Sequence, residues 1–215
     1  MKERGMIFNA EMVRAILDGR KTQTRRTVKP QPDEDGLVKL INGPWVDTSE
    51  RNYRCPFGDV GDRIWVRETF QGPLFDYEQM EAYLEDSSRF EKPEFCQYAA
   101  DGGHRPEYQD ADDNLRHGWR PSIHMPRWAS RILLEITDVR VERLNSIHDV
   151  DAMREGIQNL TTCSHADFGI PGVVNAQHPV RAFQLLWESI YGADSWKFNP
   201  WVWVIEFKVV NCGGD

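Results

Sequence analysis

Two long stretches in which apolar and polar residues alternate set the strongest limit on the fold of this chain. They read SRILLEITDVRVERL at residues 130–144 and WVWVIEFKV at residues 201–209. Such alternation is typical of β-strands, because successive side chains point to opposite faces of a sheet. In the first stretch the apolar phase changes after Thr137, which predicts a bulge or a bend of the kind that barrel strands need. In the second we expect one apolar face, with Glu206 and Lys208 on the other.

Three helices with clear end signals are expected between the strands, and each is followed by a glycine. They lie within residues 9–19, 146–156 and 178–192. Asn9 is a favourable N-cap for the first, and Ser146 forms an S-x-x-D capping box with Asp149 in the second. Pro179 starts the third, where a helix tolerates its missing N–H. Strands scattered among a few helices, without regular βαβ alternation, predict an α+β fold: a small mixed barrel with helices packed at its ends.

One acidic segment carries the entire net charge of the chain. The 215 residues have a formal net charge of −8, and residues 71–118 hold 12 acidic and 4 basic side chains, a balance of −8. The remainder is neutral with local basic clusters, so the total charge does not decide what one groove binds. The segment contains a predicted helix at 74–86 and a strand around 96–99. We interpret the chain as a single domain of residues 1–215, with 71–118 as an insertion or elaborated connection.

The composition disfavours several classes of protein. The chain has no run of about 18 apolar residues, so we expect no membrane span. Its first residues lack the apolar region of a signal peptide, which favours a cytoplasmic protein. The four cysteines form no C-x-x-C pair, which disfavours both a zinc site and a disulfide framework. Cys163 and His165 come nearest to a ligand pair, and we expect neither a metal nor another cofactor. The sequence gives no indication of the oligomeric state.

The stretch DGRKTQTRR at residues 18–26 places four cationic side chains and two threonines within seven residues. A threonine hydroxyl is a poor nucleophile unless a base lies beside it, and a lysine with a lowered pKa can be that base. Lys21 and Thr24 are the candidates, and the neighbouring arginines would lower the pKa of Lys21. Residues 21 and 24 of a strand would face opposite sides, so the pair needs a kink or a loop. The simpler alternative is a solvated basic stretch with strand-forming threonines.

Three further residues are candidates for a site, each with a structural alternative. Glu155 lies in the last turn of its helix, where the macrodipole disfavours a carboxylate unless a cation is near; otherwise it is a surface glutamate. Trp65 lies between Arg63 and Arg67, an arrangement suited to stacking on a base with phosphate contacts on either side. The alternative is a core tryptophan on a strand covered on both faces. His124 is either a polar site residue or a structural residue of a proline-bounded loop.

The stretch ILDGRKTQTRR resembles the signature of the ASCH domain family, whose members have a PUA-like β-barrel. In the small bacterial members a helix ends at a glycine and continues into G-R-K-T-x-T-x-R. The matching positions are Gly19, Arg20, Lys21, Thr22, Thr24 and Arg26. The G-D-x-I turn at 61–64, the capped helix with its late glutamate and the closing V-I-E-F-K strand are similar as well. Residues 71–118 and much of 157–178 have no counterpart in the small members. Several blocks resemble longer relatives that are common in prophages.

The resemblance implies a function that the residue pattern alone does not. PUA-like folds commonly bind RNA or modified bases, and some small ASCH proteins are amidohydrolases that remove the acetyl group from N4-acetylcytidine. Their lysine, threonine and glutamate fall on Lys21, Thr24 and Glu155 of this chain. Thr24 would attack the acetyl carbonyl, Lys21 would pass the hydroxyl proton to the leaving amine, and Glu155 would orient Lys21 or shuttle a proton. Arg26 or backbone N–H groups would stabilise the oxyanion.

We therefore expect the basic stretch to form the floor of a nucleobase pocket, in which Arg20, Arg26, Trp65 and Arg67 bind the substrate. The first hypothesis is an amidohydrolase that acts on an acylated nucleoside without a metal. The second is a non-catalytic module that recognises RNA or a modified base. The third is a metal-independent nuclease, in which Lys21, Arg26 and His124 would bind phosphate, since a fold alone does not determine the chemistry.

Overall fold

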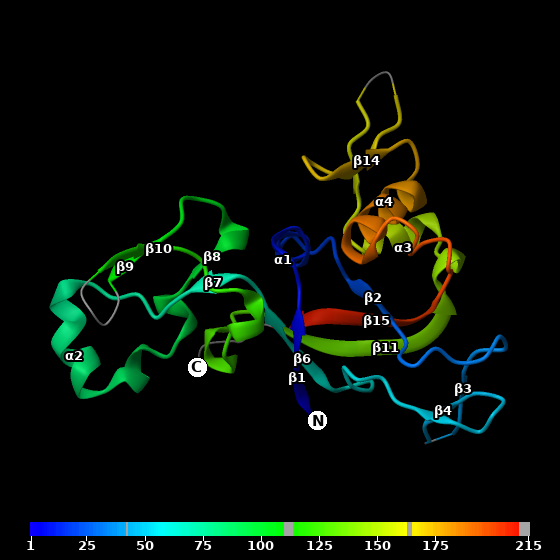
Figure 1. The fold of residues 1–215 in the computed structure, drawn as a ribbon, viewed down its shortest axis with the longest axis horizontal. Coiled ribbons are helices and arrows are strands. Elements are labelled where there is room, and N and C mark those ends of the chain that lie inside the picture. Colours follow the sequence, from blue (N-terminus) through cyan, green and yellow to red (C-terminus); the bar gives the residue numbers. More distant parts are fainter. Residues whose placement is uncertain (42, 110–113, 163–164, 211–215) are drawn as a thin grey trace. The chain divides into compact units, whose positions relative to one another are not determined.

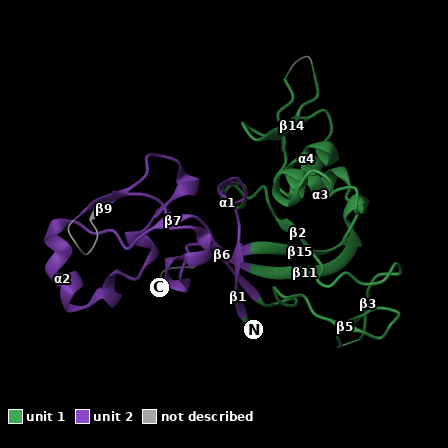
Figure 2. Cartoon of the chain, in the orientation of Figure 1, with its two compact units in different colours: residues 1–2, 15–62, 135–208 green, residues 3–14, 63–134, 209–215 purple. Residues whose placement is uncertain are grey.

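The computed structural model shows an α+β fold with a mixed sheet (Figure 1). It describes residues 1–41, 43–109, 114–162 and 165–210. The chain divides into two compact units (Figure 2). Unit 1 comprises residues 1–2, 15–62 and 135–208, and unit 2 comprises residues 3–14, 63–134 and the described residues 209–210. The predicted α+β class is confirmed. The described residues of the acidic segment 71–118 all belong to unit 2, and the interpretation of this segment as an insertion into a single domain stays a prediction.

Unit 1 contains β2 and most of β11 and β15, which are neighbours in the order β11, β15 and β2. The strands span Leu133–Arg143 in β11, Trp201–Val210 in β15 and Gln23–Thr27 in β2. β2 is antiparallel to β15, with Thr24 opposite Ile205 and Arg25 opposite Val204. Residues directly opposite one another in a sheet share a face. The register therefore places Thr24 and Arg25 on opposite faces of this sheet.

The change of apolar phase in β11 is present in the structure. Ile136 is buried before Thr137, and Val139 is buried after it. β11 continues through this point as one strand, which bends along its length in Figure 1. The prediction of a bend is confirmed, whereas the closed barrel stays a prediction.

β15 is buried on both faces, which differs from the single apolar face that its sequence predicts. Trp203 and Ile205 are buried on one face, and Val202 and Val204 are buried on the other. Polarity begins only at Glu206, which is half-buried. The reason is that both faces are covered: Val202 and Val204 belong to a buried cluster with Phe183 and Trp187. On the other face, the ring of Trp203 lies against that of Trp45, with ring centroids 5.7 Å apart.

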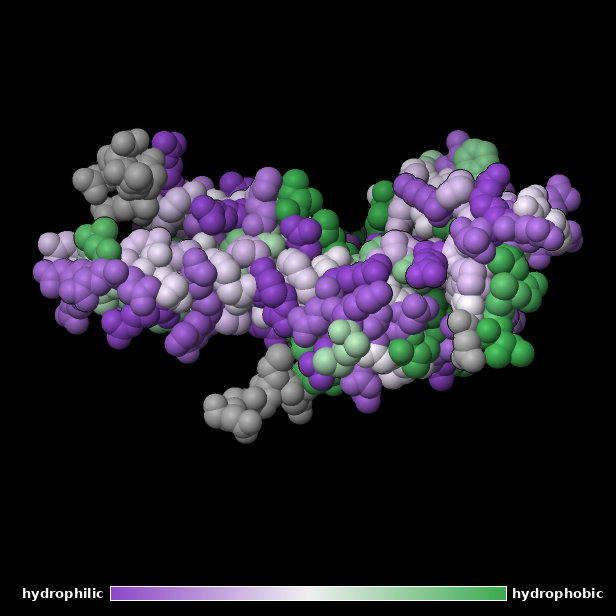
Figure 3. Space-filling model, turned by 90° about the horizontal axis from the view of Figure 1, so that it is seen from below, coloured by the Kyte–Doolittle hydropathy of each residue, from purple (hydrophilic) through white to green (hydrophobic). Residues whose placement is uncertain are grey.

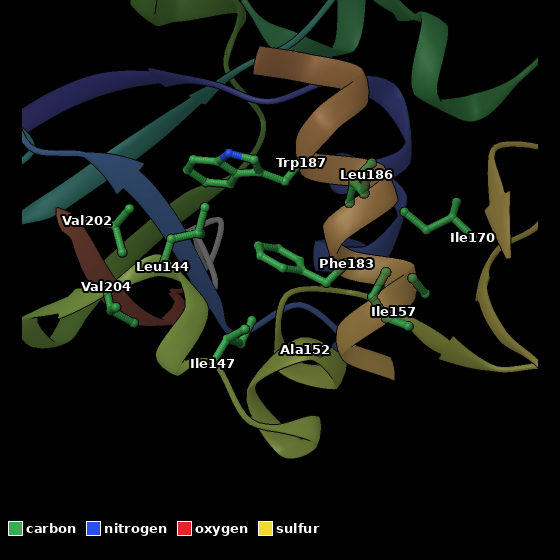
Figure 4. Close-up of a cluster of buried hydrophobic side chains, with 11 residues drawn as sticks. Leu144, Ile147, Ala152, Ile157, Ile170, Phe183, Leu186, Trp187, Val202 and Val204 are labelled. Atoms are coloured by element: carbon green, nitrogen blue, oxygen red, sulfur yellow. The ribbon is translucent and has the colours of Figure 1, made fainter. Parts of the chain in front are cut away.

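Two helices cover the face of the sheet that carries Val204. They are α3 (Asp149–Arg154) and α4 (Pro179–Tyr191), and their apolar side chains form one cluster with that face (Figure 4). Its buried members are Leu144, Ile147, Ala152, Ile157, Ile170, Ala182, Phe183, Leu186, Trp187, Val202 and Val204. Two small antiparallel sheets complete unit 1. One contains β12 (Gln158–Asn159), β13 (Phe168–Ile170) and β14 (Val174–Ala176), and the other contains β3 (Val38–Lys39), β4 (Trp45–Val46) and β5 (Asn52–Tyr53).

The ends of α1 and α4 agree with the predicted signals. α1 spans Ala10–Leu17, and the side-chain oxygen of Asn9 accepts a hydrogen bond from the N–H of Met12 at 2.9 Å. α4 has Pro179 in its first turn and ends at Gly192. The φ of Gly192 is 99°, a conformation that glycine adopts more readily than other residues.

The start of α3 differs from the prediction. Ser146 ends a 3-10 turn over Leu144–Ser146, and Ile147 follows in an extended conformation with its side chain buried in the apolar cluster. The N-cap of α3 is His148, whose side chain makes no capping hydrogen bond. The predicted capping box of Ser146 and Asp149 is therefore wrong, because burial of Ile147 keeps the chain extended where the box requires the helix to begin.

Unit 2 contains the strands β1 (Glu3–Ile7) and β6 (Arg63–Arg67), which pair in parallel. In its described residues the acidic segment forms short helices and strands, together with several 3-10 turns. The strands and the α-helix are β7 (Phe70–Gln71), α2 (Met80–Glu85), β8 (Gln97–Tyr98), β9 (Glu107–Gln109) and β10 (Leu115–His117). The helix and the strand predicted in this segment are confirmed as α2 and β8, and both are shorter than expected.

A buried ion pair anchors the acidic segment within unit 2. Glu68 is 1% exposed and accepts two hydrogen bonds from Arg131, each of 3.0 Å. Arg131 also donates to Asp101 of the acidic segment at 2.7 and 2.8 Å, and its guanidinium lies 3.9 Å from the ring centroid of Tyr98. Burial raises the pKa of Glu68, an effect that Arg131 opposes. Tyr98 also packs with Phe70, Met125 and Ala129 in a buried apolar cluster. The segment is thus held by paired charges as well as by apolar contacts.

The face of the molecule seen in Figure 3 is mostly hydrophilic, with apolar residues in separate patches. Exposed apolar side chains of unit 1 include Val38, Leu40 and Ile41, at and just after β3. Every helix in the described part of the chain is too short or too polar to cross a bilayer.

Candidate functional site

Lys21 and Glu155 form a buried ion pair in unit 1. The side chain of Lys21 is 0% exposed and that of Glu155 is 3% exposed. Nζ of Lys21 lies 2.7 Å from Oε2 of Glu155 and 2.9 Å from the backbone oxygen of the same residue. Lys21 directly precedes the β2 region, and Glu155 is the C-cap of α3. Two of the three residues that the resemblance groups together are therefore in contact.

Two glycine turns bring these residues together. Gly19 follows α1 with a φ of 71°, and the N–H groups of Arg20 and Lys21 both donate to the carbonyl of Ala15 at 2.9 Å. Gly156 follows α3 with a φ of 108°. A Cβ at Gly156 would lie 3.1 Å from Cβ of Ala15 and 3.6 Å from Cβ of Lys21. Both the conformation and the close approach therefore require glycine at position 156.

The C-terminal carbonyls of α3 accept hydrogen bonds from the residues that lead into β2. The N–H of Thr22 donates to the carbonyl of Arg154 at 2.9 Å, and the ammonium group of Lys21 donates to the carbonyl of Glu155. A cation at this end of a helix interacts favourably with the macrodipole. Lys21 is thus the cation that offsets the unfavourable position of the Glu155 carboxylate.

Arg25 is a second buried cation on Glu155. Its side chain is 0% exposed, and Nη1 lies 3.2 Å from Oε1 of Glu155. Nη2 lies 3.0 Å from Oδ2 of Asp151 and 3.2 Å from Oε2 of Glu142. Gln23, two residues earlier, donates from Nε2 to the carbonyl of Asp151 at 3.1 Å. Gln23 and Arg25 thus reach α3 from the same face of β2.

The ion pairs continue towards solvent through Arg140. Its Nε lies 2.6 Å from Oε1 of Glu142, and its Nη1 lies 2.5 Å from Oε1 of Glu206. All three side chains are between 26% and 29% exposed. The network therefore runs from fully buried charges at Lys21 to partly hydrated ones, where ion pairs contribute less to stability.

Burial lowers the pKa of Lys21 below its ordinary value of 10.5. The charge and the hydrogen bond of Glu155 oppose this effect, whereas the positive charges of Arg26 and Arg25 lower the pKa further. A lysine in such surroundings releases its proton more readily than an exposed one, which is the property required of a general base.

Thr24 lies on the opposite face of β2 from Arg25. It is 2% exposed and stands opposite Ile205 in the neighbouring strand. Within the described residues, no hydrogen bond joins Thr24 to Lys21 or to Glu155; Lys21 Nζ donates to Glu155. Thr24 and the side chains that contact Glu155 therefore lie on opposite faces of the strand. This is the obstacle to a Lys21–Thr24 pair that the sequence predicts.

Arg20 and Arg26, both expected to bind substrate, have different surroundings. Arg20 is half-buried and donates to the carboxylate of Asp18 at 2.7 and 3.3 Å and to the carbonyl of Gly156 at 3.2 Å. Arg26 is half-buried and stands opposite Trp203, on the same face of β2 as Thr24. Their predicted roles in binding a substrate stay predictions.

Trp65 and Arg67 belong to β6 of unit 2, and both are half-buried. The ring of Trp65 covers Gly5 of β1, where a Cβ would lie 2.7 Å from a ring carbon. The guanidinium of Arg67 lies 5.4 Å from the centroid of that ring, and it donates to two carbonyls of the 3-10 turn Ser122–His124. His124 itself is exposed. Arg67 thus has a structural contact that the sequence analysis did not anticipate.

No group of three or more His, Cys, Asp or Glu side chains in the described ranges is arranged to hold a metal ion. The Cys163–His165 pair is not among these groups, because Cys163 lies outside the described residues.

Arg25, Asp151 and Glu142 are site residues that the sequence analysis did not select. Arg25 could have been found from the alternation of side chains along a strand. In an extended segment, positions 23 and 25 lie on the same face as position 21, so a site at Lys21 points to them as well. Asp151 and Glu142 carry no such signal, because they approach Arg25 from α3 and β11 through tertiary packing.

Comparisons with protein-family models, with curated proteins and with solved structures gave no match for this chain. The interpretation of the site therefore rests on its geometry and on the resemblance of the basic stretch to the ASCH signature.

Proposed function

We propose that this chain is a nucleoside amidohydrolase of the ASCH type, with a PUA-like fold, that cleaves the amide bond of an N4-acylated cytidine. The observation that carries the proposal is the buried contact of 2.7 Å between Nζ of Lys21 and Oε2 of Glu155. The resemblance assigns these two residues to one constellation although they are far apart in the sequence. A contact between them supports that assignment.

In the proposed reaction the hydroxyl oxygen of Thr24 attacks the acyl carbonyl, and the amine of Lys21 accepts the hydroxyl proton. Lys21 then donates that proton to the leaving N4 amine as the amide bond breaks, and water hydrolyses the acyl-threonine. Glu155 orients Lys21 throughout. The lowered pKa of Lys21 favours its first step, because only the neutral amine can accept a proton.

The surroundings of Thr24 favour the second candidate function, a non-catalytic module that binds RNA or a modified base. Thr24 and Lys21 make no hydrogen bond within the described residues, and the side chain of Lys21 is fully buried. In this second function the Lys21–Glu155 pair holds β2 against α3 and has no chemical role.

Turnover of N4-acetylcytidine, followed as cytidine release by chromatography, tests the proposal. The parent, Lys21→Met, Thr24→Val and the control Lys208→Met are compared, because Lys208 is an exposed lysine of β15 in the same unit. We expect turnover by the parent and the control. Lys21→Met should lose about 100-fold or more, the usual contribution of general-base catalysis, and Thr24→Val should lose at least as much because it lacks the nucleophile. Absence of turnover by the parent at high enzyme concentration would exclude this activity and leave the binding module.

A further inference from the structure

Two buried cations share one buried carboxylate in the candidate site. Oε2 of Glu155 accepts from Lys21 at 2.7 Å, and Oε1 accepts from Arg25 at 3.2 Å. The side chains of Lys21 and Arg25 are both 0% exposed, and that of Glu155 is 3% exposed. Water therefore screens these charges only weakly, and each charge strongly affects the other two.

The two cations are not equivalent in their chemistry. A guanidinium keeps its proton at any pH at which a protein is folded, whereas a lysine loses its proton readily when it is buried. Arg25 thus provides a permanent counter-charge for Glu155. Lys21 is the member of the trio that can change its charge without leaving Glu155 as an unpaired buried anion.

Arg25 is itself held from two directions. Nη2 contacts Asp151 of α3 at 3.0 Å and Glu142 of β11 at 3.2 Å, and Nη1 contacts Glu155. A guanidinium presents its donors in one rigid plane, so these contacts fix the carboxylate of Glu155 in a definite orientation. The other oxygen of that carboxylate is the one that meets Lys21.

We propose that Arg25 is a positioning residue of this site: it holds Glu155 by one carboxylate oxygen and directs the other oxygen at Lys21. The inference deepens the proposed function and rests on it for the catalytic meaning of Lys21. It adds a residue outside the matched G-R-K-T-x-T-x-R positions, since Arg25 occupies the variable place between Thr24 and Arg26.

The charged groups that face Lys21 define what the loss of Arg25 does. They are Glu155 from the C-cap of α3 and Arg25 and Arg26 from β2, with Asp151 and Glu142 one contact further away. Removal of Arg25 takes away a positive charge near the ammonium group of Lys21. It also leaves Lys21 as the one of these two cations that contacts the Glu155 carboxylate. Both changes favour the protonated lysine, so its pKa rises.

The test is a titration of the Lys21 side chain in the full chain, observed by NMR of lysine labelled with carbon-13 at Cε. The Lys21 signal is identified by its absence in Lys21→Met. We expect a higher pKa of Lys21 in Arg25→Met than in the parent. Arg140→Met is the matched control, because Arg140 has the same side chain and belongs to the same network without touching Glu155. In that control we expect the pKa of Lys21 to be unchanged.

Arg25→Lys keeps the proposal testable if Arg25→Met fails to fold. It retains a positive charge but lacks the planar pair of donors, so it shares less of the Glu155 carboxylate than Arg25 does. More of the negative charge of Glu155 then acts on Lys21, and we expect the pKa of Lys21 to rise in this variant too, by less than in Arg25→Met. An unchanged pKa of Lys21 in a folded Arg25→Met or Arg25→Lys variant would overturn the inference, and so would an equal rise in Arg140→Met.

The pH profile of N4-acetylcytidine turnover separates this inference from the proposed function. If the parent is active, the acid limb of kcat/KM should move to higher pH in Arg25→Met, because that limb reports the pKa of the base in the free enzyme. An acid limb that stays in place while the NMR titration shifts would show that Lys21 is not the base. If the parent is inactive, the proposed function fails, and the NMR titration alone decides whether Arg25 positions Glu155 against Lys21.

Discussion

At the scale of single residues, the burial of Lys21 couples the stability of the fold to pH. Burial lowers the pKa of Lys21 in the native chain below the 10.5 of an exposed lysine. Between these two pKa values the unfolded chain binds more protons than the native chain, so the free energy of unfolding rises with pH. The rise ends near the unfolded pKa, above which both states hold the neutral amine.

We expect Lys21→Met to lose this rise, because methionine fills the same space without a titratable group. Urea unfolding of the parent and the variant, at a series of pH values between about 7 and about 11, measures it. The difference in unfolding free energy between the two proteins should change steadily across the interval. A pH-independent difference would mean that the native lysine titrates at its ordinary value. Lys208→Met, at an exposed position, should follow the parent.

At the scale of elements, Gly156 follows α3 and lies against Lys21, in the segment that leads into β2. Its φ of 108° is unfavourable for residues with a Cβ, and the added methyl group of alanine would lie 3.1 Å from Cβ of Ala15. We expect Gly156→Ala to lower the free energy of unfolding by about 1–3 kcal/mol, the usual cost of a strained backbone residue. Chemical denaturation measures this change.

Gly118→Ala is the control for Gly156→Ala. A Cβ at Gly118 meets no atom within 4 Å, and its φ lies outside the positive region, so its replacement should change stability by about 0.5 kcal/mol or less. Equal stability of the Gly156→Ala variant and the parent would show that the turn after α3 relaxes without cost.

The sequence predicts the elements of this chain better than their contacts. Asn9 and Pro179 mark helix starts correctly, because caps depend on neighbouring residues alone. The capping box at Ser146 fails because the burial of Ile147, a tertiary effect, overrides it. β15 is buried on both faces for a similar reason, because residues distant in the sequence, such as Phe183 and Trp45, cover its two faces.

In the candidate site, too, the sequence indicates some contacts and leaves out those that depend on tertiary packing. The contact of Lys21 with Glu155 is consistent with the resemblance of the basic stretch to a known signature. The contacts of Arg25 with Asp151 and Glu142 depend on the packing of α3 and β11 against β2, which no local pattern in the sequence encodes.

At the scale of the whole molecule, the distribution of charge bears on which ligand is bound, an uncharged nucleoside or a polynucleotide. The excess of acidic residues lies in the segment 71–118, and the remainder of the chain is neutral. An uncharged nucleoside neutralises no phosphate contacts, so its affinity should change by less than about 2-fold between roughly 50 and 200 mM salt. A polynucleotide with 6 or more phosphate contacts would lose about 1,000-fold or more over the same range. Calorimetric titration of N4-acetylcytidine and of a short RNA at several salt concentrations distinguishes the two.

The pairing of β2 with β15 also governs the order in which this protein can be assembled. β2 comprises residues 23–27, and its partner in the sheet comprises residues 201–210. During synthesis β2 leaves the ribosome long before β15 has been made. Until then, the backbone groups of β2 that pair with β15 have no partner in that strand. Pairing over such a distance along the chain is slow, and an unpaired strand is open to association with other chains. The half of the candidate site that β2 contributes therefore becomes ordered only after β15 has been synthesised. Until then, other factors in the cell must protect the unpaired strand from association.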